Sequence, residues 1–437
     1  MQLIRRNVLG SRARGRRASA LVHWALLGWW LLSSPAAGQS SFDATTTIFR
    51  ESGGPLNMTV INPSVAANAQ VVDAFSVQAG WEADVVSGAS VAVVDAPGGG
   101  NEVDAITSAT TLSDFRQVAR GGMGLRGDTT RLDAFYSYGW ENDYRSQTLG
   151  VRAAAELFER NTILDLTYNR GWDQVCDLLQ PEAEKAVERQ RMANSEGCFE
   201  RGKGRTTRDL DTYGLQGGWT QNWTPIFNTQ VLLSAQLLHG FQSNPYRAVW
   251  LGRRAAQEHH PDDRARYAVG LGSRLWLRPI GGALQLMARA YRDTWDVKSV
   301  SAELAYERNI GVYFRLRARG RYYRQTAAAF YSDDYALDPA GQYFTGDREL
   351  SAMSSWLVGG RFEFLPGGDR AEPMLGFIDS LRIVLKADFL RYEFPISTTV
   401  SLKSPTTRPS LERSASRAFS RRKRPGSETR TTCPLLL

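Results

Sequence analysis

The side chains with the clearest chemical potential are four arginines at alternate positions of one short stretch. Residues 314–322 carry Arg315, Arg317, Arg319 and Arg321, separated by apolar or small residues. Side chains of a β-strand alternate between two faces, so this spacing places all four guanidinium groups on one face, whereas a helix would spread them around its circumference. The pattern predicts a basic ladder on one side of a strand.

Acidic residues at matching positions are available to neutralise this ladder. Glu303 and Glu307 lie in the stretch before it, and Glu363 lies in the stretch after it. Opposite charges that face each other across a sheet usually pair. These acids are too few to pair with every arginine, so two interpretations stay open: internal neutralisation, and an electropositive strip that favours anions.

Histidine and cysteine offer little for catalysis or metal binding. The four histidines are His23, His239, His259 and His260. Hydrolysis needs a base beside a nucleophile, and no such spacing is evident. His259 and His260 precede Asp262 and Asp263, but a solvated polar loop explains this group better than a metal site. We expect no metal and no cofactor.

Two of the three cysteines bracket a hydrophilic insert. Cys176 and Cys198 stand at its two ends, and Cys433 lies in the C-terminal tail. In an oxidising compartment the first pair is expected to form a disulfide that closes the insert into an extracellular cap. Metal ligation is the alternative, but two thiols without nearby histidines make a poor site.

The net charge of +8 comes from the two ends of the chain. Residues 1–38 carry six arginines and no acid, and residues 397–437 carry nine basic residues against Glu412 and Glu428. The intervening residues are therefore net acidic, which argues against a nucleic-acid partner.

The N-terminus has the form of an export signal. A basic stretch precedes the apolar residues 20–32, and small residues follow at 35–38, so cleavage is expected before Gln39. A membrane-anchoring helix is the alternative, but the apolar run falls short of the ~20 residues that span a bilayer.

Beyond residue 70 the sequence repeats a pattern of alternating, aromatic-rich stretches broken by turn residues. In residues 131–140, Leu132, Ala134, Tyr136, Tyr138 and Trp140 share one face, while polar residues occupy the other and Phe135 is the exception. This pattern is typical of outer-membrane barrels. The predicted fold is all-β: a transmembrane antiparallel up-and-down β-barrel of about fourteen strands.

Thirteen strands are clear, and a closing strand is doubtful. They are predicted near 70–86, 115–126, 129–141, 146–158, 161–172, 208–221, 227–242, 264–278, 282–297, 299–308, 311–324, 349–365 and 380–394. Residues 39–69 are predicted as a periplasmic or plug segment before the barrel of residues 70–396. Residues 397–437 are predicted as a disordered basic tail, a divergent or frame-shifted substitute for the closing strand. The four longest connections all follow odd-numbered strands, as extracellular loops do.

Several segments resemble signatures of the outer-membrane barrel family called domain of unknown function 3570. They are residues 240–249 (GFQSNPYRAV), 291–297 (YRDTWDV), 321–335 (RYYRQTAAAFYSDDY) and 103–110 (VDAITSAT). The resemblance runs from about residue 70 to 395 and implies the barrel fold, but the family brings no assigned catalytic or binding residues. Family members close with an amphipathic strand that ends in an aromatic residue, whereas this chain ends in Pro434-Leu435-Leu436-Leu437.

The favoured function is a pore or transport channel of unknown substrate in a Gram-negative outer membrane. The alternative is a non-conducting scaffold, plugged by residues 43–68 or by an inward-folded loop, that docks a periplasmic or surface protein. A barrel enzyme acting at the outer leaflet is the third hypothesis. The fold implies contact with outer-membrane lipid and insertion by the barrel assembly machinery.

Overall fold

A computed structural model describes residues 40–51, 58–88, 112–141, 143–178, 205–244, 248–251, 255–336, 339–367, 380–395 and 430–434. Two three-residue 3-10 helices, η2 (Arg278–Ile280) and η3 (Arg348–Leu350), are present, and the regular structure is otherwise β-strand. No helix in these ranges is long and apolar enough to cross a bilayer.

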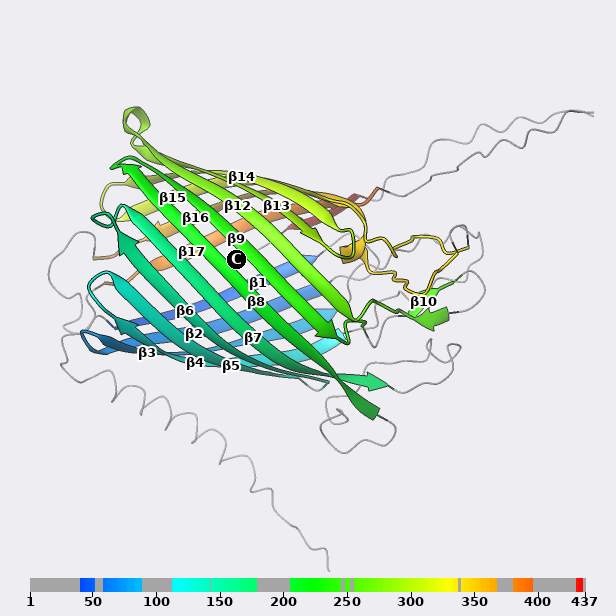
Figure 1. The fold of residues 1–437 in the computed structure, drawn as a ribbon. Helices are drawn as coiled ribbons and strands as arrows, with labels where there is room; N and C mark the ends of the chain where they lie inside the picture. Colours follow the sequence, from blue (N-terminus) through cyan, green and yellow to red (C-terminus); the bar gives the residue numbers. More distant parts are fainter. Residues whose placement is uncertain are drawn as a thin grey trace, which may run out of the picture.

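Sixteen strands form one antiparallel sheet in which each strand pairs with its neighbour in the sheet (Figure 1). They are β1 (Ser41–Glu51), β2 (Met58–Val72), β3 (Phe75–Gly88), β4 (Leu112–Arg126), β5 (Thr130–Trp140), β6 (Tyr144–Leu157), β7 (Thr162–Leu178), β8 (Arg205–Thr224), β9 (Phe227–Gly240), β12 (Asp263–Leu277), β13 (Gly282–Asp293), β14 (Lys298–Ile310), β15 (Phe314–Gln325), β16 (Met353–Phe364), β17 (Ile383–Glu393) and β18 (Arg430–Pro434). The short strands β10 (Ala248–Trp250) and β11 (Ala255–Gln257) form a separate hairpin.

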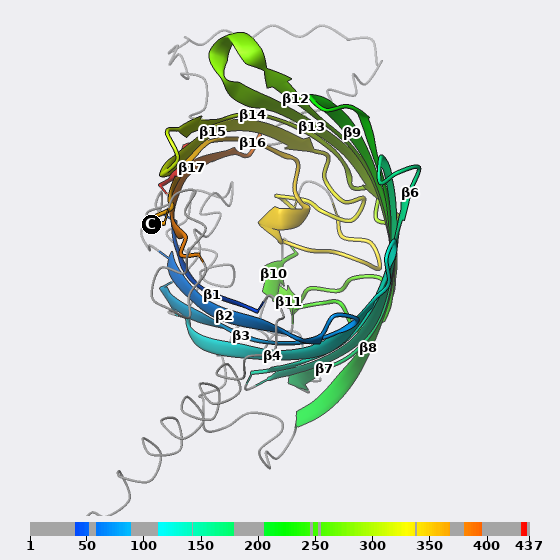
Figure 2. The same cartoon turned by 90° about the vertical axis from the view of Figure 1, so that its left-hand side faces the viewer.

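The sheet curves round into a barrel, as the end-on view shows (Figure 2). Its first and last strands, β1 and β18, contact each other. Closure matters because an unpaired sheet edge in hydrocarbon costs several kcal/mol for each unsatisfied backbone group.

Apolar and polar side chains separate onto the two faces of the wall. On β16, Trp356 and Val358 are 53% and 65% exposed, whereas Glu363 is only 1% exposed. The exposed apolar residues lie on the outer face, where they meet lipid, and charged residues line the interior. This arrangement confirms the predicted fold class of an antiparallel outer-membrane barrel.

Connections of different length are sorted to opposite ends of the barrel (Figure 1). One end has short turns, such as 73–74 between β2 and β3 and 225–226 between β8 and β9. The other end has the long connections, including 241–262 and 326–352. This confirms that the longest inserts share one side, which is the extracellular side in barrels of this kind.

The prediction that residues 39–69 form a periplasmic or plug segment is wrong, because they contribute β1 and β2 to the wall. The two strands pair throughout, from Ser41 with Asn68 to Glu51 with Met58. Their outward positions include Phe42, Ile61 and Val65, but Ala44, Thr46 and a proline interrupt the apolar alternation. The sheet consequently has two more strands than expected.

Proline at position 63 interrupts the pairing of β2 with β3, and the preceding asparagine compensates. The ladder passes from the Ile61–Val85 pair directly to the Ser64–Glu82 pair. In the gap, the Asn62 side-chain amide donates to the Ala83 carbonyl at 3.1 Å and to Asp84 Oδ1 at 2.8 Å. Side-chain hydrogen bonds thus replace the backbone bond that proline cannot make.

The prediction that residues 397–437 are disordered is wrong for Arg430–Pro434, which forms β18. This strand pairs with β17, from Phe389 with Pro434 to Glu393 with Arg430. The remainder of the tail and the predicted signal peptide, residues 1–38, lie outside the described residues. The short strand carries no period-two apolar pattern, so sequence alone does not reveal it.

Phe135, the one aromatic residue on the polar face of β5, packs over a glycine of the next strand. Phe135 pairs with Gly150 in the ladder. A Cβ atom at position 150 would lie only 2.1 Å from the Phe135 ring. The glycine therefore provides the space that the ring occupies, and such aromatic–glycine pairs help to fix strand register.

We expect Asn62→Ala to destabilise the barrel, because it leaves the Ala83 carbonyl and the interrupted ladder without their hydrogen bonds. The expected loss in unfolding free energy is about 1–3 kcal/mol, measured by urea titration of protein refolded into lipid vesicles. Asn68→Ala, on the same strand, is the matched control because its side chain makes no hydrogen bond to any described residue. Equal stability of the two variants would contradict the compensating role of Asn62.

Candidate pore lining and extracellular cap

The four ladder arginines lie on the interior face of β15. Their strand neighbours Leu316 and Phe314 are 40% and 37% exposed on the outer face. In the ladder, Arg317 stands opposite Glu307 of β14, and Arg315 stands opposite Glu363 of β16. The structure thus brings the basic ladder and its three predicted acidic partners together on one wall.

Each of the three acids contacts more than one cation. Glu303 lies 3.4 Å from Arg317 and 3.5 Å from Arg319. Glu307 lies 3.0 Å from Arg274 and 3.9 Å from Arg315. The carboxylates are therefore shared, and no arginine has an acid to itself here.

Glu363 is the most heavily shared of these carboxylates. It lies 3.0 Å from Arg361, 3.7 Å from Arg315 and 3.8 Å from Arg382. A buried carboxylate requires such partners, because desolvation of an unpaired charge is costly. Glu363 therefore joins β15, β16 and the start of β17 into one electrostatic unit.

A fourth acid, Asp388 on β17, also contacts the ladder, and it was not predicted from the sequence. Arg319 makes two hydrogen bonds to it, at 3.0 and 2.6 Å, and Lys386 lies 3.1 Å away. The signal was available, because Lys386 and Asp388 alternate in the same way as the ladder. Arg361 and Glu363 repeat this spacing on β16.

Two acids of this wall are much more buried than the cations that contact them. The Glu363 and Asp388 side chains are 2% and 4% exposed, whereas Arg315 is 38% and Lys386 54% exposed. Four acids serve seven cations, which are Arg274, Arg315, Arg317, Arg319, Arg361, Arg382 and Lys386. The wall formed by β12 to β17, here called the basic wall, therefore presents positive charge to the interior.

The facing wall contains more evenly matched ion pairs. Arg120 lies 2.5 Å from Glu82, and Arg131 lies 2.8 Å from Asp133. Arg152 lies 3.9 Å from Asp165. Each of these ion pairs, on β3 to β7, joins one described cation to one described acid.

A folded segment from the extracellular connections lies at the barrel mouth, within the ring of strands in the end-on view and partly beyond the strand ends in the side view (Figures 1 and 2). We call the described residues of 241–262, 294–297 and 326–352 the cap. Its core contains Trp295, Val297, Ala328 and Leu350, all at most 7% exposed. The cap therefore has its own small hydrophobic core and does not rely on lipid for burial.

Asp293, at the end of β13, anchors the cap to the barrel. Its carboxylate accepts hydrogen bonds from Arg264 at 2.5 Å and from the Tyr291 hydroxyl at 2.7 Å. It also accepts from the backbone amides of Trp295 and Val297, at 3.0 and 2.9 Å. The Arg264 guanidinium in turn lies 3.9 Å above the Trp295 ring, so a single carboxylate organises the turn between β13 and β14.

A second buried carboxylate, Glu258, holds the separate cap segments together. It accepts from the Asn244 amide at 2.7 Å and from the Thr345 hydroxyl at 2.9 Å. His260 Nε2 lies 3.6 Å away, and its ring packs against Trp295 and Phe330. Residues far apart in sequence thus converge on one site, and the segments that resemble the family's signatures build much of it.

The cap chemistry favours a structural role for its histidines. His259 Nδ1 lies 2.9 Å from the Gln342 carbonyl oxygen, and His260 Nδ1 lies 3.1 Å from that of Gln242. The described residues contain no group of three or more potential ligands placed to hold a metal ion. A cavity of about 410 Å³ in the cap is lined by Trp295, Phe330 and Tyr343, among others.

The disulfide prediction concerns Cys176, which is buried at the end of β7. Its predicted partner Cys198, like most of the insert between them, lies outside the described residues. The pairing stays a prediction.

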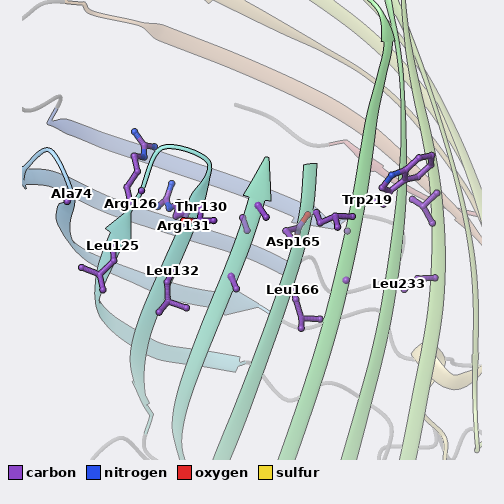
Figure 3. Close-up of a pocket in the computed structure, with 18 residues that line it drawn as sticks. Ala74, Leu125, Arg126, Thr130, Arg131, Leu132, Asp165, Leu166, Trp219 and Leu233 are labelled. Atoms are coloured by element: carbon purple, nitrogen blue, oxygen red, sulfur yellow. The ribbon is translucent and has the colours of Figure 1, made fainter. Parts of the chain in front are cut away.

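A larger hollow of about 770 Å³ lies near the end with the short turns (Figure 3). Its lining includes Leu125, Leu132, Leu166 and Leu233, which are outward-facing and exposed. The hollow therefore belongs to the lipid-facing surface, where acyl chains can fill it, and not to the lumen.

Comparison with known proteins identifies the family but no activity. The family model described as "Protein of unknown function (DUF3570)" matches residues 25–364. No curated protein matches the sequence.

Solved structures with a similar fold are outer-membrane proteins. The siderophore receptor PirA from Pseudomonas aeruginosa aligns with a TM-score of 0.38 and 12% identity, over 81% of this chain and 55% of that chain. OmpT of Vibrio cholerae aligns with a TM-score of 0.39 and 12% identity, over 75% and 98%. OccK2 of P. aeruginosa aligns with a TM-score of 0.36 and 8% identity, over 82% and 91%. This chain spans about half the length of the siderophore receptor. The family match alone covers most of the barrel and cap, and the chain belongs to the DUF3570 family.

Proposed function

We propose that this protein is an outer-membrane pore for small hydrophilic solutes, with a preference for anions. The observation that carries the proposal is the basic wall, where exposed cations cover buried acids. Barrels of sixteen or more strands enclose an aqueous channel, whereas eight-stranded barrels are filled by their own side chains. Charged residues lining such a channel set its ion selectivity.

Pairing within the basic wall does not cancel its effect on a passing ion. The acids are shared and lie beneath the cations, so an ion in the lumen is nearer to guanidinium and ammonium groups than to carboxylates. The facing wall has matched pairs. The lumen is therefore expected to concentrate anions along β12 to β17.

The cap gives this pore a constriction at its extracellular mouth. Inward-folded segments of this kind limit solute size, and their stability determines how often the mouth opens.

The position of the cap at the mouth also favours a second candidate function. This candidate is a non-conducting scaffold whose lumen is plugged by the cap and which docks a surface or periplasmic protein. An outer-leaflet enzyme is a third hypothesis, for which lipase, acyltransferase and protease assays are the direct tests. In each case we expect insertion by the barrel assembly machinery.

We expect the reconstituted protein to give single-channel current steps and an anion-selective reversal potential in a salt gradient. Replacing Arg317 and Arg319 together by alanine should shift the reversal potential towards cation selectivity, because the shared acids Glu303 and Asp388 lose cations. Measurements in planar bilayers test both expectations.

The control for this experiment is Arg324→Ala, on the outer face of the same strand, which should leave the reversal potential unchanged. An unchanged, cation-selective potential in the double variant would refute the role of the basic wall. Silence from correctly folded wild-type protein would refute the pore.

We expect Trp295→Ala to open the mouth, because it removes the central aromatic residue of the cap core. The single-channel conductance should rise, or the open time should lengthen, with the barrel itself intact by heat-modifiable gel mobility. Trp356→Ala, on the lipid-facing surface, is the matched control. Conductance that appears only in the Trp295 variant would instead favour the plugged scaffold, and identical currents from all three proteins would contradict a gating cap.

Glu141 makes the stability of the fold depend on pH. It lies in the connection between β5 and β6, where burial, and then the nearby Asp143, raise the pKa of its carboxyl to about 7. Its usual pKa is 4.5. The folded state therefore binds this proton more tightly than the unfolded state does, so the associated stability is present below pH 4.5 and is lost as pH rises through about 7.

We expect Glu141→Gln to match the wild type in thermal stability at pH 4 and to exceed it above pH 7, where the wild type must hold a desolvated charge. The difference in melting temperature should reach a few degrees, measured by circular dichroism in detergent between pH 4 and 8.5. Glu159→Gln, at an exposed turn, is the control. A difference that does not vary with pH would contradict the raised pKa.

A further inference from the structure

The basic wall contains three interior arginines that make no ion pair with any described residue, and two of them also make no hydrogen bond to one. Arg289 on β13 and Arg321 on β15 make no ion pair with any described residue, whereas the ladder residues Arg315, Arg317 and Arg319 all do. Arg266, which also makes no such pair, donates to Gln236 Oε1 at 3.2 Å. Arg289 and Arg321 are thus the cations of this wall that remain available to a ligand in the lumen.

The strand register places these two arginines close together on one face. Arg289 stands opposite Ser301 of β14, and Ser301 stands opposite Tyr323 of β15. Arg321 is two residues along from Tyr323, on the same face. Strand spacing and residue rise put the two arginine Cα atoms roughly 12 Å apart. At this separation both guanidinium groups can contact the same small ion.

The nearest acid does not occupy this position. Glu303 stands opposite Arg321 in the register, but its carboxylate forms its ion pairs with Arg317 and Arg319, at 3.4 and 3.5 Å. Those two arginines lie further along β15, towards the end with the short turns. Among the described residues, no carboxylate makes an ion pair with Arg321 on the side nearer to the cap.

We infer that Arg289 and Arg321 form a binding subsite for a small oxyanion, the carboxylate or phosphate group of a permeating solute. The inference rests on the proposed pore function and specifies its substrate class. A guanidinium group donates two parallel hydrogen bonds to an oxyanion, which gives geometric selectivity beyond that of a diffuse positive charge. The hydroxyl group of Ser301, on the strand between the two arginines, provides a further donor.

The position of the subsite suits transport. Arg289 is exposed to the lumen, so a bound anion keeps part of its hydration and binds weakly. A channel site must attract its ion and also release it. The subsite lies between the cap and the shared ion pairs, so an anion that passes the mouth meets unpaired arginines before it meets the neutralised part of the wall.

The test is the single-channel current carried in planar bilayers as inorganic phosphate or citrate is titrated against a chloride background. Wild-type protein is expected to show saturable block of the chloride current. In the double variant Arg289→Gln with Arg321→Gln the half-blocking concentration should rise at least about tenfold, equivalent to about 1.4 kcal/mol. Arg324→Gln, on the outer face of β15, should leave it unchanged.

The outcomes separate this inference from the proposed pore. Anion-selective current without saturable block, or equal block in the double variant, would overturn the subsite and leave the pore intact. If folded wild-type protein gives no current, equilibrium dialysis with labelled phosphate replaces the conductance measurement. Binding that the double variant loses would then support the subsite in a non-conducting barrel, and absence of binding would overturn it.

Discussion

The rest of this structure depends on the requirement that every backbone polar group in the hydrocarbon region be paired within the protein. A sheet meets this requirement only by closing on itself, and closure fixes which side chains face lipid and which face the lumen. Pro63 shows how strict the requirement is, because the gap it leaves is repaired by the Asn62 side chain. Once one face of the sheet contacts lipid, charged residues near the bilayer midplane are strongly favoured on the interior face.

That confinement explains the organisation of charge in the lumen. The arginines at alternate positions of β15 face the interior, because an arginine on the lipid face near the bilayer midplane would destabilise the barrel by ~2–4 kcal/mol. Carboxylates on β14, β16 and β17 then lie against the wall beneath the longer cationic side chains, and Glu363 alone contacts three cations. The long arginine side chains extend past the shorter acids, so partial neutralisation and a positive lumen surface exist together. The two interpretations of the ladder are therefore not exclusive.

Sequence predicted the barrel and thirteen of its strands because strong outward residues, such as Leu132 and Trp356, mark period two. It did not predict β1 and β2 because alanine, threonine and proline interrupt the apolar residues of their outer face, and these strands are placed by their pairing with each other and with β3. The ladder and its three acids were found by local spacing. Asp388 was overlooked although it has the same spacing, and the sharing of Glu258 between Asn244 and Thr345 has no local signal, since it joins residues 14 and 87 positions apart.

The cap is stabilised by its own hydrophobic core, whereas the wall is stabilised by strand pairing. The two contact each other near the seam, where the first strand, β1, meets the last strands, β17 and β18. Arg348, in η3 of the cap, lies 3.7 Å from Glu51 at the end of β1, and its guanidinium lies 4.4 Å above the Phe394 ring, just beyond β17. These strands flank the short β18. At the opposite end of the seam, Arg382 lies 4.0 Å from Asp43 of β1. Arginine contacts therefore connect the two sides of the seam where strand pairing is shortest, so displacement of the cap would also remove a contact that holds the barrel closed. Opening of the mouth by small movements of the cap segments would keep this contact, whereas release of the whole cap would break it.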